Sequence, residues 1–212
     1  MNSISVKFIG HACFVLSFGD YRVVMDPYSD GSVPGLKPVR LEADMVICSH
    51  GHGDHNASDN IIVTGRKNED LKVEEFVIPH DEKNGALRGM NSITRFIWKG
   101  YSLVHMGDVG VIPDAKIISE LFHSDLVIFP VGGYYTLPPA DAKSMIDRIQ
   151  PGYAIPMHYR NSKSGYPVLS SLEDYLDYEN IILSDSSEFI LREKSDFHAA
   201  KLIALKAENE EK

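Results

Sequence analysis

Cysteine is scarce in this chain of 212 residues, which contains only Cys13 and Cys48. Two cysteines are too few for a scaffold stapled by disulfides, and Cys48 ends an apolar run typical of buried residues. No apolar run approaches the roughly 18–20 residues that a membrane helix needs. The N-terminal residues also lack a charged segment followed by an apolar one. We therefore expect a cytoplasmic protein that does not engage the membrane.

Basic side chains are also in the minority, with 21 Lys and Arg against 30 Asp and Glu and a formal net charge of −9. Broad nucleic-acid binding needs clustered basic side chains, so the charge disfavours a nucleic-acid partner, and we expect a small-molecule substrate. The hydrophobic fraction of 43% is ordinary for a globular protein. We expect one domain over residues 1–212, with a charged, frayed tail from about residue 200. The oligomeric state is left open.

Short runs rich in Val, Ile, Phe and Tyr predict mainly strands in the first half and strand–helix units in the second. Gly and Pro in residues 28–40 predict a loop that is long enough to cover another part of the molecule. Helices are expected at residues 115–122, 140–149 and 172–178, and the tail from residue 198 has helical character. Strands are expected at residues 5–9, 13–18, 21–25, 45–48, 61–64, 72–78, 93–98, 101–105, 126–129, 153–156 and 188–191. Together these elements predict an α/β fold of two sheets with helices outside.

Histidine, by contrast, is abundant, and the segment SHGHGDHN at residues 49–56 follows one of the predicted strands. A helix would set its first two histidines about 200° apart, whereas a turn made flexible by glycine can bring them together. A histidine-rich surface loop is the alternative, but this segment is internal and follows an apolar strand. Imidazole and carboxylate ligands suit zinc first, with manganese, iron or nickel as alternatives. The predicted ligands are His50, His52, Asp54 and His55.

This segment resembles the HxHxDH signature of the metallo-β-lactamase superfamily and matches it at every ligand position. The resemblance implies an αββα four-layer sandwich, with two mixed β-sheets and helices on the outer faces. It also implies two divalent metal ions. His50 and His52 would bind the first ion, and Asp54 and His55 would bind the second.

The same resemblance implies three further ligands, and His80, Asp108 and His158 occur in the expected order. Asp108 would bridge both ions, and His158 would complete the site of the second. For the third histidine of the first ion, His80 precedes Asp108 by 28 residues, with two predicted strands between them. His105 precedes Asp108 by only three residues, which is too little chain to reach across such a site. We therefore favour His80 and keep His105 as the alternative ligand or as a supporting histidine.

Sequences elsewhere in the chain resemble a branch of the superfamily described as Zn-dependent hydrolases, which is related to lactonases acting on phosphorylated ascorbate. The matching segments are residues 8–12, 25–27, 85, 88–91, 131–133 and 156–159. They are specific for the fold and the metal site but not for the substrate.

Several other polar residues are candidates for contacting substrate or supporting a ligand. Asp26 could orient a ligand imidazole or merely cap a turn. Arg88 could bind a carboxylate or phosphate, or could be an ordinary surface arginine. Tyr135 could stabilise an oxyanion, although plain packing is the alternative. The remaining candidates are His11, which could be purely structural, and Asn91 and Tyr159, which are chosen by position. His123 and His198 receive no role.

Two bound ions can hold a hydroxide that attacks a carbonyl or phosphorus. Asp54 and Asp108 are the residues expected to hold the proton of the nucleophile. We therefore predict a metal-dependent hydrolase of a small ester, lactone, amide or phosphodiester. The alternatives are a nuclease or phosphodiesterase acting on nucleic acid and a non-catalytic metal-binding module. Redox members with a di-iron centre replace the second motif histidine by Glu, so the presence of His52 disfavours that chemistry.

Overall fold

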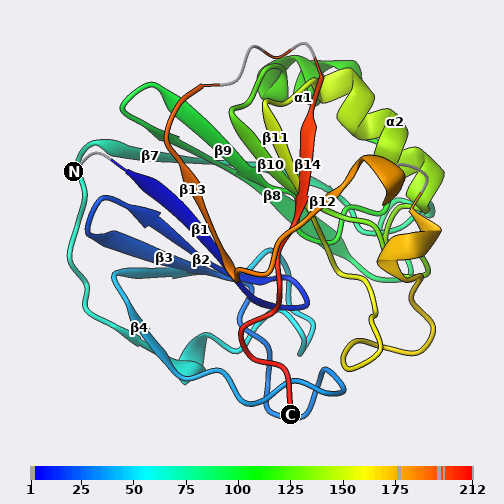
Figure 1. The fold of residues 1–212 in the computed structure, drawn as a ribbon, viewed down its shortest axis with the longest axis horizontal. Coiled ribbons are helices and arrows are strands. Elements are labelled where there is room, and N and C mark those ends of the chain that lie inside the picture. The colour runs from blue at the N-terminus through cyan, green and yellow to red at the C-terminus, as the bar shows by residue number, and fades with distance from the viewer. Residues whose placement is uncertain (1–2, 176–177, 195–196, 198, 212) are drawn as a thin grey trace.

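The computed structural model describes residues 3–175, 178–194, 197 and 199–211. Two mixed β-sheets pack face to face, and a small two-stranded sheet lies beside them (Figure 1). The five-stranded sheet has the order β13 (Glu188–Leu191), β1 (Ile4–Gly10), β2 (Cys13–Phe18), β3 (Tyr21–Met25) and β5 (Met45–Ile47). The seven-stranded sheet has the order β12 (Ile182–Leu183), β14 (Lys201–Ala204), β11 (Tyr153–Met157), β10 (Leu126–Pro130), β9 (Tyr101–His105), β8 (Met90–Trp98) and β7 (Leu71–Pro79).

The core between the sheets follows from the alternation of side chains along each strand. In β1 and β2, Val6, Phe8 and Leu16 point into this core, which they share with Phe96 and Ile128 of the larger sheet. All five residues of β10 are buried, because this parallel strand is covered on both faces. The run LVIFP therefore lacks the alternation of a half-exposed strand.

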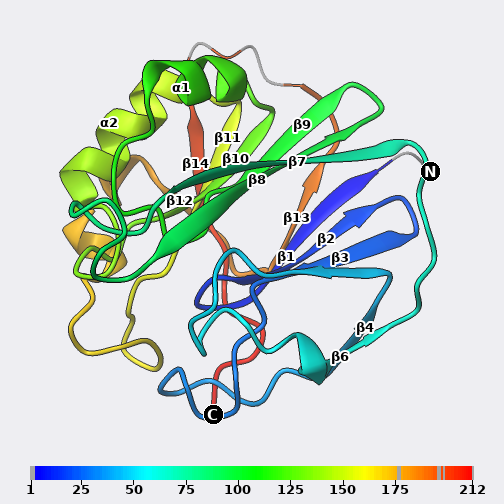
Figure 2. The ribbon, with the colours of Figure 1, turned by 180° about the vertical axis from the view of Figure 1, so that it is seen from behind.

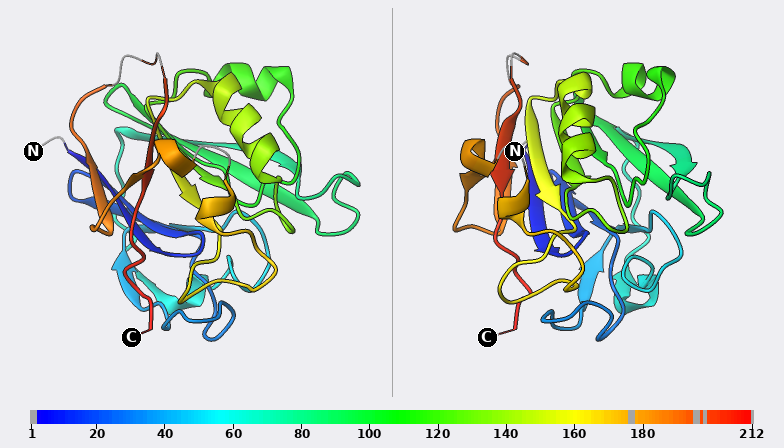
Figure 3. Two further views of the ribbon diagram at one scale, coloured as in Figure 1. Left: turned by 45° about the vertical axis from the view of Figure 1, so that its right-hand side comes forward. Right: turned by 90° about the vertical axis from the view of Figure 1, so that its right-hand side faces the viewer.

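Both α-helices of the described residues pack on the outer face of the seven-stranded sheet (Figure 3). Helix α1 (Ala115–Leu121) begins where the Asp114 side chain accepts a hydrogen bond from the Ile117 N–H at 2.9 Å. Helix α2 (Pro139–Ile149) has Pro139 in its first turn and ends at Gln150, whose φ is +51°. Among the described residues, no helix is long and apolar enough to cross a bilayer.

The outer face of the five-stranded sheet is covered by irregular chain, and the described residues place no α-helix there. Tyr28, Val33, Leu36 and Val39 of the predicted covering loop pack on it. The pair β4 (Leu41–Ala43) and β6 (Ile61–Val63) lies beside β3, as Figure 2 shows, with the 3₁₀ turn η1 (Ser58–Asn60) leading into β6. The expected layers of two sheets are present, with helices on one outer side and a loop on the other.

The helical prediction for the tail is wrong, because Lys201–Ala204 form β14 between β11 and β12. Leu202, Ile203 and Ala204 are all buried, so burial on both faces of a sheet overrides the helix propensity of Ala, Leu and Lys. The predicted helix at 172–178 is also wrong, since its described part holds only the 3₁₀ turns η2 (Leu172–Asp174) and η3 (Tyr178–Asn180). His198 and residues 176–177 lie outside the described residues.

Candidate metal centre

The predicted ligands lie in loops that follow strands on one side of the molecule. Strands β7 and β9 run antiparallel to β8, and β9 runs parallel to β10 and β11, so β7, β9 and β11 end at the same edge. These loops carry His80, Asp108 and His158, and the loop after β5 carries residues 50–55. The topology thus brings together side chains that are up to 108 residues apart in sequence, as His50 and His158 are.

Three histidines form the first cluster of potential ligands. Ring nitrogens of His50, His52 and His80 all lie within 4.8 Å of one another. The ring centroids of His50 and His80 are 4.7 Å apart, and those of His52 and His80 are 5.3 Å apart. His80, which was favoured as the third histidine, therefore lies with the first two motif histidines.

A second cluster combines Asp54, His55 and His158 with His11, again within 4.8 Å of one another. His11 Nε2 lies 3.1 Å from Asp54 Oδ2, and the ring centroids of His11 and His158 are 4.1 Å apart. Burial lowers the pKa of His11 to about 4, so this imidazole is neutral at pH 7, and its Nε2–H donates a hydrogen bond to the Asp54 carboxylate. His11 therefore lies inside the cluster, next to a predicted ligand.

Asp108 lies where the two clusters meet. Its Oδ2 is 3.1 Å from His158 Nε2, 3.3 Å from His55 Nε2 and 3.5 Å from His80 Nε2. Burial alone would raise the pKa of this carboxyl, but His158 and His55 lower it well below its usual range. Asp108 is thus an ionised carboxylate that faces imidazoles of both clusters.

The donor set fits divalent metal ions. His50 Nε2, His55 Nε2, His158 Nε2 and Asp108 Oδ1 are buried, and none has a hydrogen-bond partner within the described part of the chain. Leaving several buried polar atoms unpaired is costly, and a coordinated cation would satisfy them. Asp108 and Asp26 also raise the pKa of His55 well above its usual value, against the effect of burial. The surroundings of His55 therefore favour a positive charge.

Asp26 supports this donor set from behind. Its Oδ2 accepts a hydrogen bond from His55 Nδ1 at 2.8 Å and another from Ser49 Oγ at 2.6 Å. The Ser49 hydroxyl in turn lies 3.0 Å from His50 Nδ1, which leaves Nε2 of both histidines facing the cluster. Asp26 has a φ of +44°, a strained conformation of the kind that concentrates at functional sites.

His105 and Asn91 hold the turn that presents Asp108. His105 Nε2 lies 3.0 Å from the Ala12 carbonyl oxygen, and the Gly107 N–H donates to His105 Nδ1 at 3.2 Å. Both ring nitrogens of His105 are engaged, so it has none to offer a metal ion. The Asn91 side chain accepts from the Asp108 N–H at 2.8 Å, and a Cβ on Gly107 would lie 2.2 Å from its Oδ1. Only glycine fits at position 107.

A cavity of about 330 Å³ opens onto both clusters. Arg88 and Tyr135 line it as predicted, whereas Tyr159 packs against the apolar core on the helical side of the larger sheet. Tyr166, which the sequence did not single out, also lines it. A larger cleft of about 750 Å³, lined by Arg66, lies around the β2–β3 turn and contains none of the clustered histidines. The 330 Å³ cavity is lined by His52, Asp54, His80, Arg88, Asp108, Tyr135 and Tyr166.

Comparison with known proteins agrees with this geometry. Residues 5–158 match the family model described as the beta-lactamase superfamily domain. A UPF0173 metal-dependent hydrolase from Korarchaeum cryptofilum is 29% identical over 204 residues, which cover 82% of this chain and 89% of that protein.

Two solved structures share the fold. A proposed Zn-dependent hydrolase of the metallo-β-lactamase superfamily from Thermotoga maritima has a TM-score of 0.74 and 25% identity, covering 96% of this chain and all of that one. A metallo hydrolase from Ignicoccus hospitalis has a TM-score of 0.68 at 16% identity, covering 91% of this chain and all of that one. The predicted fold is confirmed, and this chain belongs to the metallo-β-lactamase superfamily.

Proposed function

We propose that this protein is a metal-dependent hydrolase whose active site holds two divalent ions, with zinc as the native metal. The observation that supports it most directly is the position of Asp108 Oδ2, within 3.5 Å of imidazole nitrogens from both clusters. Curated relatives such as those from Korarchaeum cryptofilum and Bacillus licheniformis carry the name metal-dependent hydrolase. These names favour turnover over a non-catalytic metal-binding module.

The two clusters divide the proposed ligands. His50, His52 and His80 would hold one ion; Asp54, His55 and His158 would hold the other; and Asp108 would contact both. Bound divalent ions would supply Lewis-acid polarisation and would lower the pKa of a bound water toward neutrality.

The chain's own groups prepare the cavity for hydrolysis. Burial raises the pKa of Asp54, but the hydrogen bond from His11 and the charge of His55 lower it below its usual range. Asp54 is thus an ionised carboxylate at the cavity wall, able to coordinate a cation and to accept a hydrogen bond from water. Burial, the charge of Asp54 and a hydrogen bond to Asp54 raise the pKa of Tyr166, so its phenol stays protonated, and in this proposal its O–H turns from Asp54 to a developing oxyanion.

The substrate in this proposal is a small ester, lactone, amide or phosphodiester. A cavity of about 330 Å³ is at the lower end of the range for small-molecule sites. The net charge of −9 gives no support to the nuclease alternative. The proposal also includes a cytoplasmic location and one domain over residues 1–212.

Elemental analysis of the zinc-reconstituted protein, together with hydrolysis assays, tests this proposal. We expect two ions per chain and turnover of at least one class in a panel of lactones, esters, amides and phosphodiesters, lost after chelation. One ion or none would contradict the dinuclear site. Absence of turnover across the panel by the fully loaded protein would contradict the hydrolase, and tight, salt-dependent RNA binding would favour the nuclease.

A further inference from the structure

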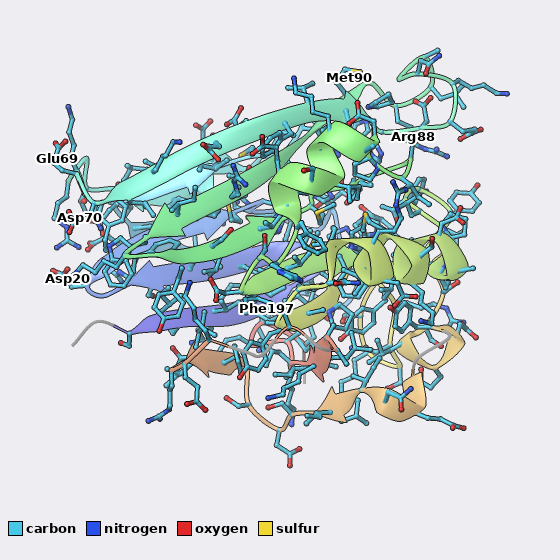
Figure 4. All side chains as sticks on the ribbon, turned by 90° about the horizontal axis from the view of Figure 1, so that it is seen from above. Asp20, Glu69, Asp70, Arg88, Met90 and Phe197 are labelled. Atoms are coloured by element: carbon cyan, nitrogen blue, oxygen red, sulfur yellow. The ribbon has the colours of Figure 1, made fainter. Side chains whose placement is uncertain are left out.

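Arg88 is the one arginine or lysine among the described residues that line the 330 Å³ cavity. It lies in the loop that follows His80, at the end of the molecule opposite Asp20 and Asp70 (Figure 4). A single cation among the predicted ligands gives the lining of the cavity an uneven distribution of charge.

The loop that carries Arg88 is built around the buried carboxylate of Asp81, which is only 1% exposed. One oxygen of Asp81 accepts hydrogen bonds from the backbone N–H groups of Lys83 and Gly85, at 2.8 and 3.1 Å. The other accepts from Leu87 and from Arg88 itself, at 3.0 and 2.7 Å. Because Asp81 directly follows His80, the same loop sets the position of a predicted metal ligand and of Arg88.

The guanidinium of Arg88 is held without being neutralised. Its Nη2 donates to the Tyr134 carbonyl oxygen at 3.2 Å, and its central carbon lies 5.5 Å from the centre of the Tyr135 ring. No carboxylate of the described residues forms an ion pair with it, although Arg66 and Arg95 each pair with two acids. A guanidinium has five N–H donors, so most of those on Arg88 remain available to a ligand.

With two divalent ions bound, the net charge of the cavity would also favour an anionic ligand. Two divalent ions would outweigh the carboxylates of Asp54 and Asp108, and Arg88 adds a further positive charge. The local field would therefore attract an anion even though the whole chain carries a net charge of −9. A planar guanidinium binds carboxylate and phosphate groups through paired hydrogen bonds, which a point charge cannot do.

Resting on the proposed hydrolase function, we propose that the substrate carries a terminal oxyanion, a carboxylate or a phosphate, which Arg88 binds while the bond to be cleaved faces the metal ligands. The aromatic rings of Tyr135 and Tyr166, whose centroids are 6.0 Å apart, form the wall beside it. A neutral ester of the same length would lack this anchor.

The test compares Arg88→Gln with Lys83→Gln, which removes the same charge from the same loop but from an exposed side chain outside the cavity. The zinc-loaded proteins are assayed with the 4-nitrophenyl monoester of glutarate and with neutral 4-nitrophenyl pentanoate. We expect Arg88→Gln to lower kcat/KM about 10- to 100-fold for the anionic ester and less than twofold for the neutral one. Lys83→Gln should change neither value.

Calorimetry keeps this inference separate from the hydrolase proposal. Glutarate and propyl phosphate are titrated into the loaded native protein and both variants, and the tighter ligand identifies the oxyanion. We expect binding about tenfold weaker or more with Arg88→Gln, and native-like binding with Lys83→Gln. Equal binding to the native protein and Arg88→Gln, or no binding to the native protein, overturns the anion site even if esters are hydrolysed. Absence of hydrolysis with intact Arg88-dependent binding contradicts the hydrolase proposal alone.

Discussion

Asp26 Oδ2 lies 2.8 Å from Nδ1 of His55, and both side chains are fully buried. This contact holds the His55 ring so that its other nitrogen faces Asp108. Ser49 donates to the same carboxylate through both its N–H and its hydroxyl, each at 2.6 Å. A buried carboxylate that anchors two positions of the same loop, Ser49 and His55, sets the orientation of a potential ligand before any ion binds.

Replacing this carboxylate should weaken metal binding without removing a proposed ligand. Asp26→Asn keeps the shape of the side chain but loses its charge and one strong acceptor. We expect the affinity for one ion to fall about 10- to 100-fold, as for other residues that support a metal ligand. Competition with a chromogenic chelator measures the change, and Asp59→Asn, at an exposed site, serves as the control. Unchanged affinity for both ions would show that Asp26 stabilises its turn but does not support metal binding.

The two candidate third histidines should behave differently when each is changed to alanine. His80→Ala should lose one ion and activity, because it removes a nitrogen from the first cluster. His105→Ala should keep both ions but lower the free energy of unfolding by about 2 kcal/mol or more, because it leaves the Ala12 carbonyl and the Gly107 N–H without partners. Metal analysis and urea unfolding measure the two effects. The opposite pattern would make His105 the ligand.

The clustering of the predicted ligands was foreseeable because the local sequence around each of them carries a recognisable pattern. The spacing of His50, His52, Asp54 and His55 excludes a helix and requires a turn, and strand ends before His80 and His158 were visible as apolar runs. The supporting role of His105 was left open, since it depends on a contact with Ala12, 93 residues away.

The roles of Tyr166, which lines the cavity, and of Asp81, which holds the loop of Arg88, were not predictable from the sequence, for physical reasons. Tyr166 lies in a loop whose path depends on tertiary contacts, such as the bond from the Gly165 N–H to the Pro34 carbonyl at 3.0 Å. The role of Asp81 depends on where four backbone N–H groups lie, which no spacing rule reveals. The helical prediction for the tail was wrong for a related reason. Local propensity favours a helix there, but pairing between β11 and β12 makes residues 201–204 a strand.

Acid should destabilise the protein partly through Asp44. The side chain of Arg66, at 2.8 Å, and the Arg22 N–H hold the pKa of this buried carboxyl well below its usual range, against the effect of burial. A carboxyl with a lowered folded pKa stabilises the fold above its unfolded pKa of about 3.9, and this contribution is lost as the pH falls through the folded pKa.

Asp44→Asn should therefore lower the free energy of unfolding by about 1–3 kcal/mol at pH 7, with a difference from the native protein that shrinks below about pH 4. Urea unfolding of the metal-free proteins between pH 3 and 7 measures this, and Asp70→Asn is the exposed control. A difference that stays constant with pH would show that the charge of Asp44 contributes nothing.

Asp108→Asn tests the residue on which the dinuclear proposal depends. Asn keeps the shape but loses the charge and one strong metal-binding oxygen, so the ion held by Asp54, His55 and His158 should be weakened more than the ion held by three histidines. We expect kcat to fall by more than KM rises, because the loss falls on the reacting centre and not on substrate binding. The fold should survive, since the Asn91 contact is to the backbone N–H of residue 108 and not to its side chain. Metal analysis, steady-state kinetics and circular dichroism measure these three effects. A folded variant that retains both ions and near-native turnover would show that Asp108 does not bridge them.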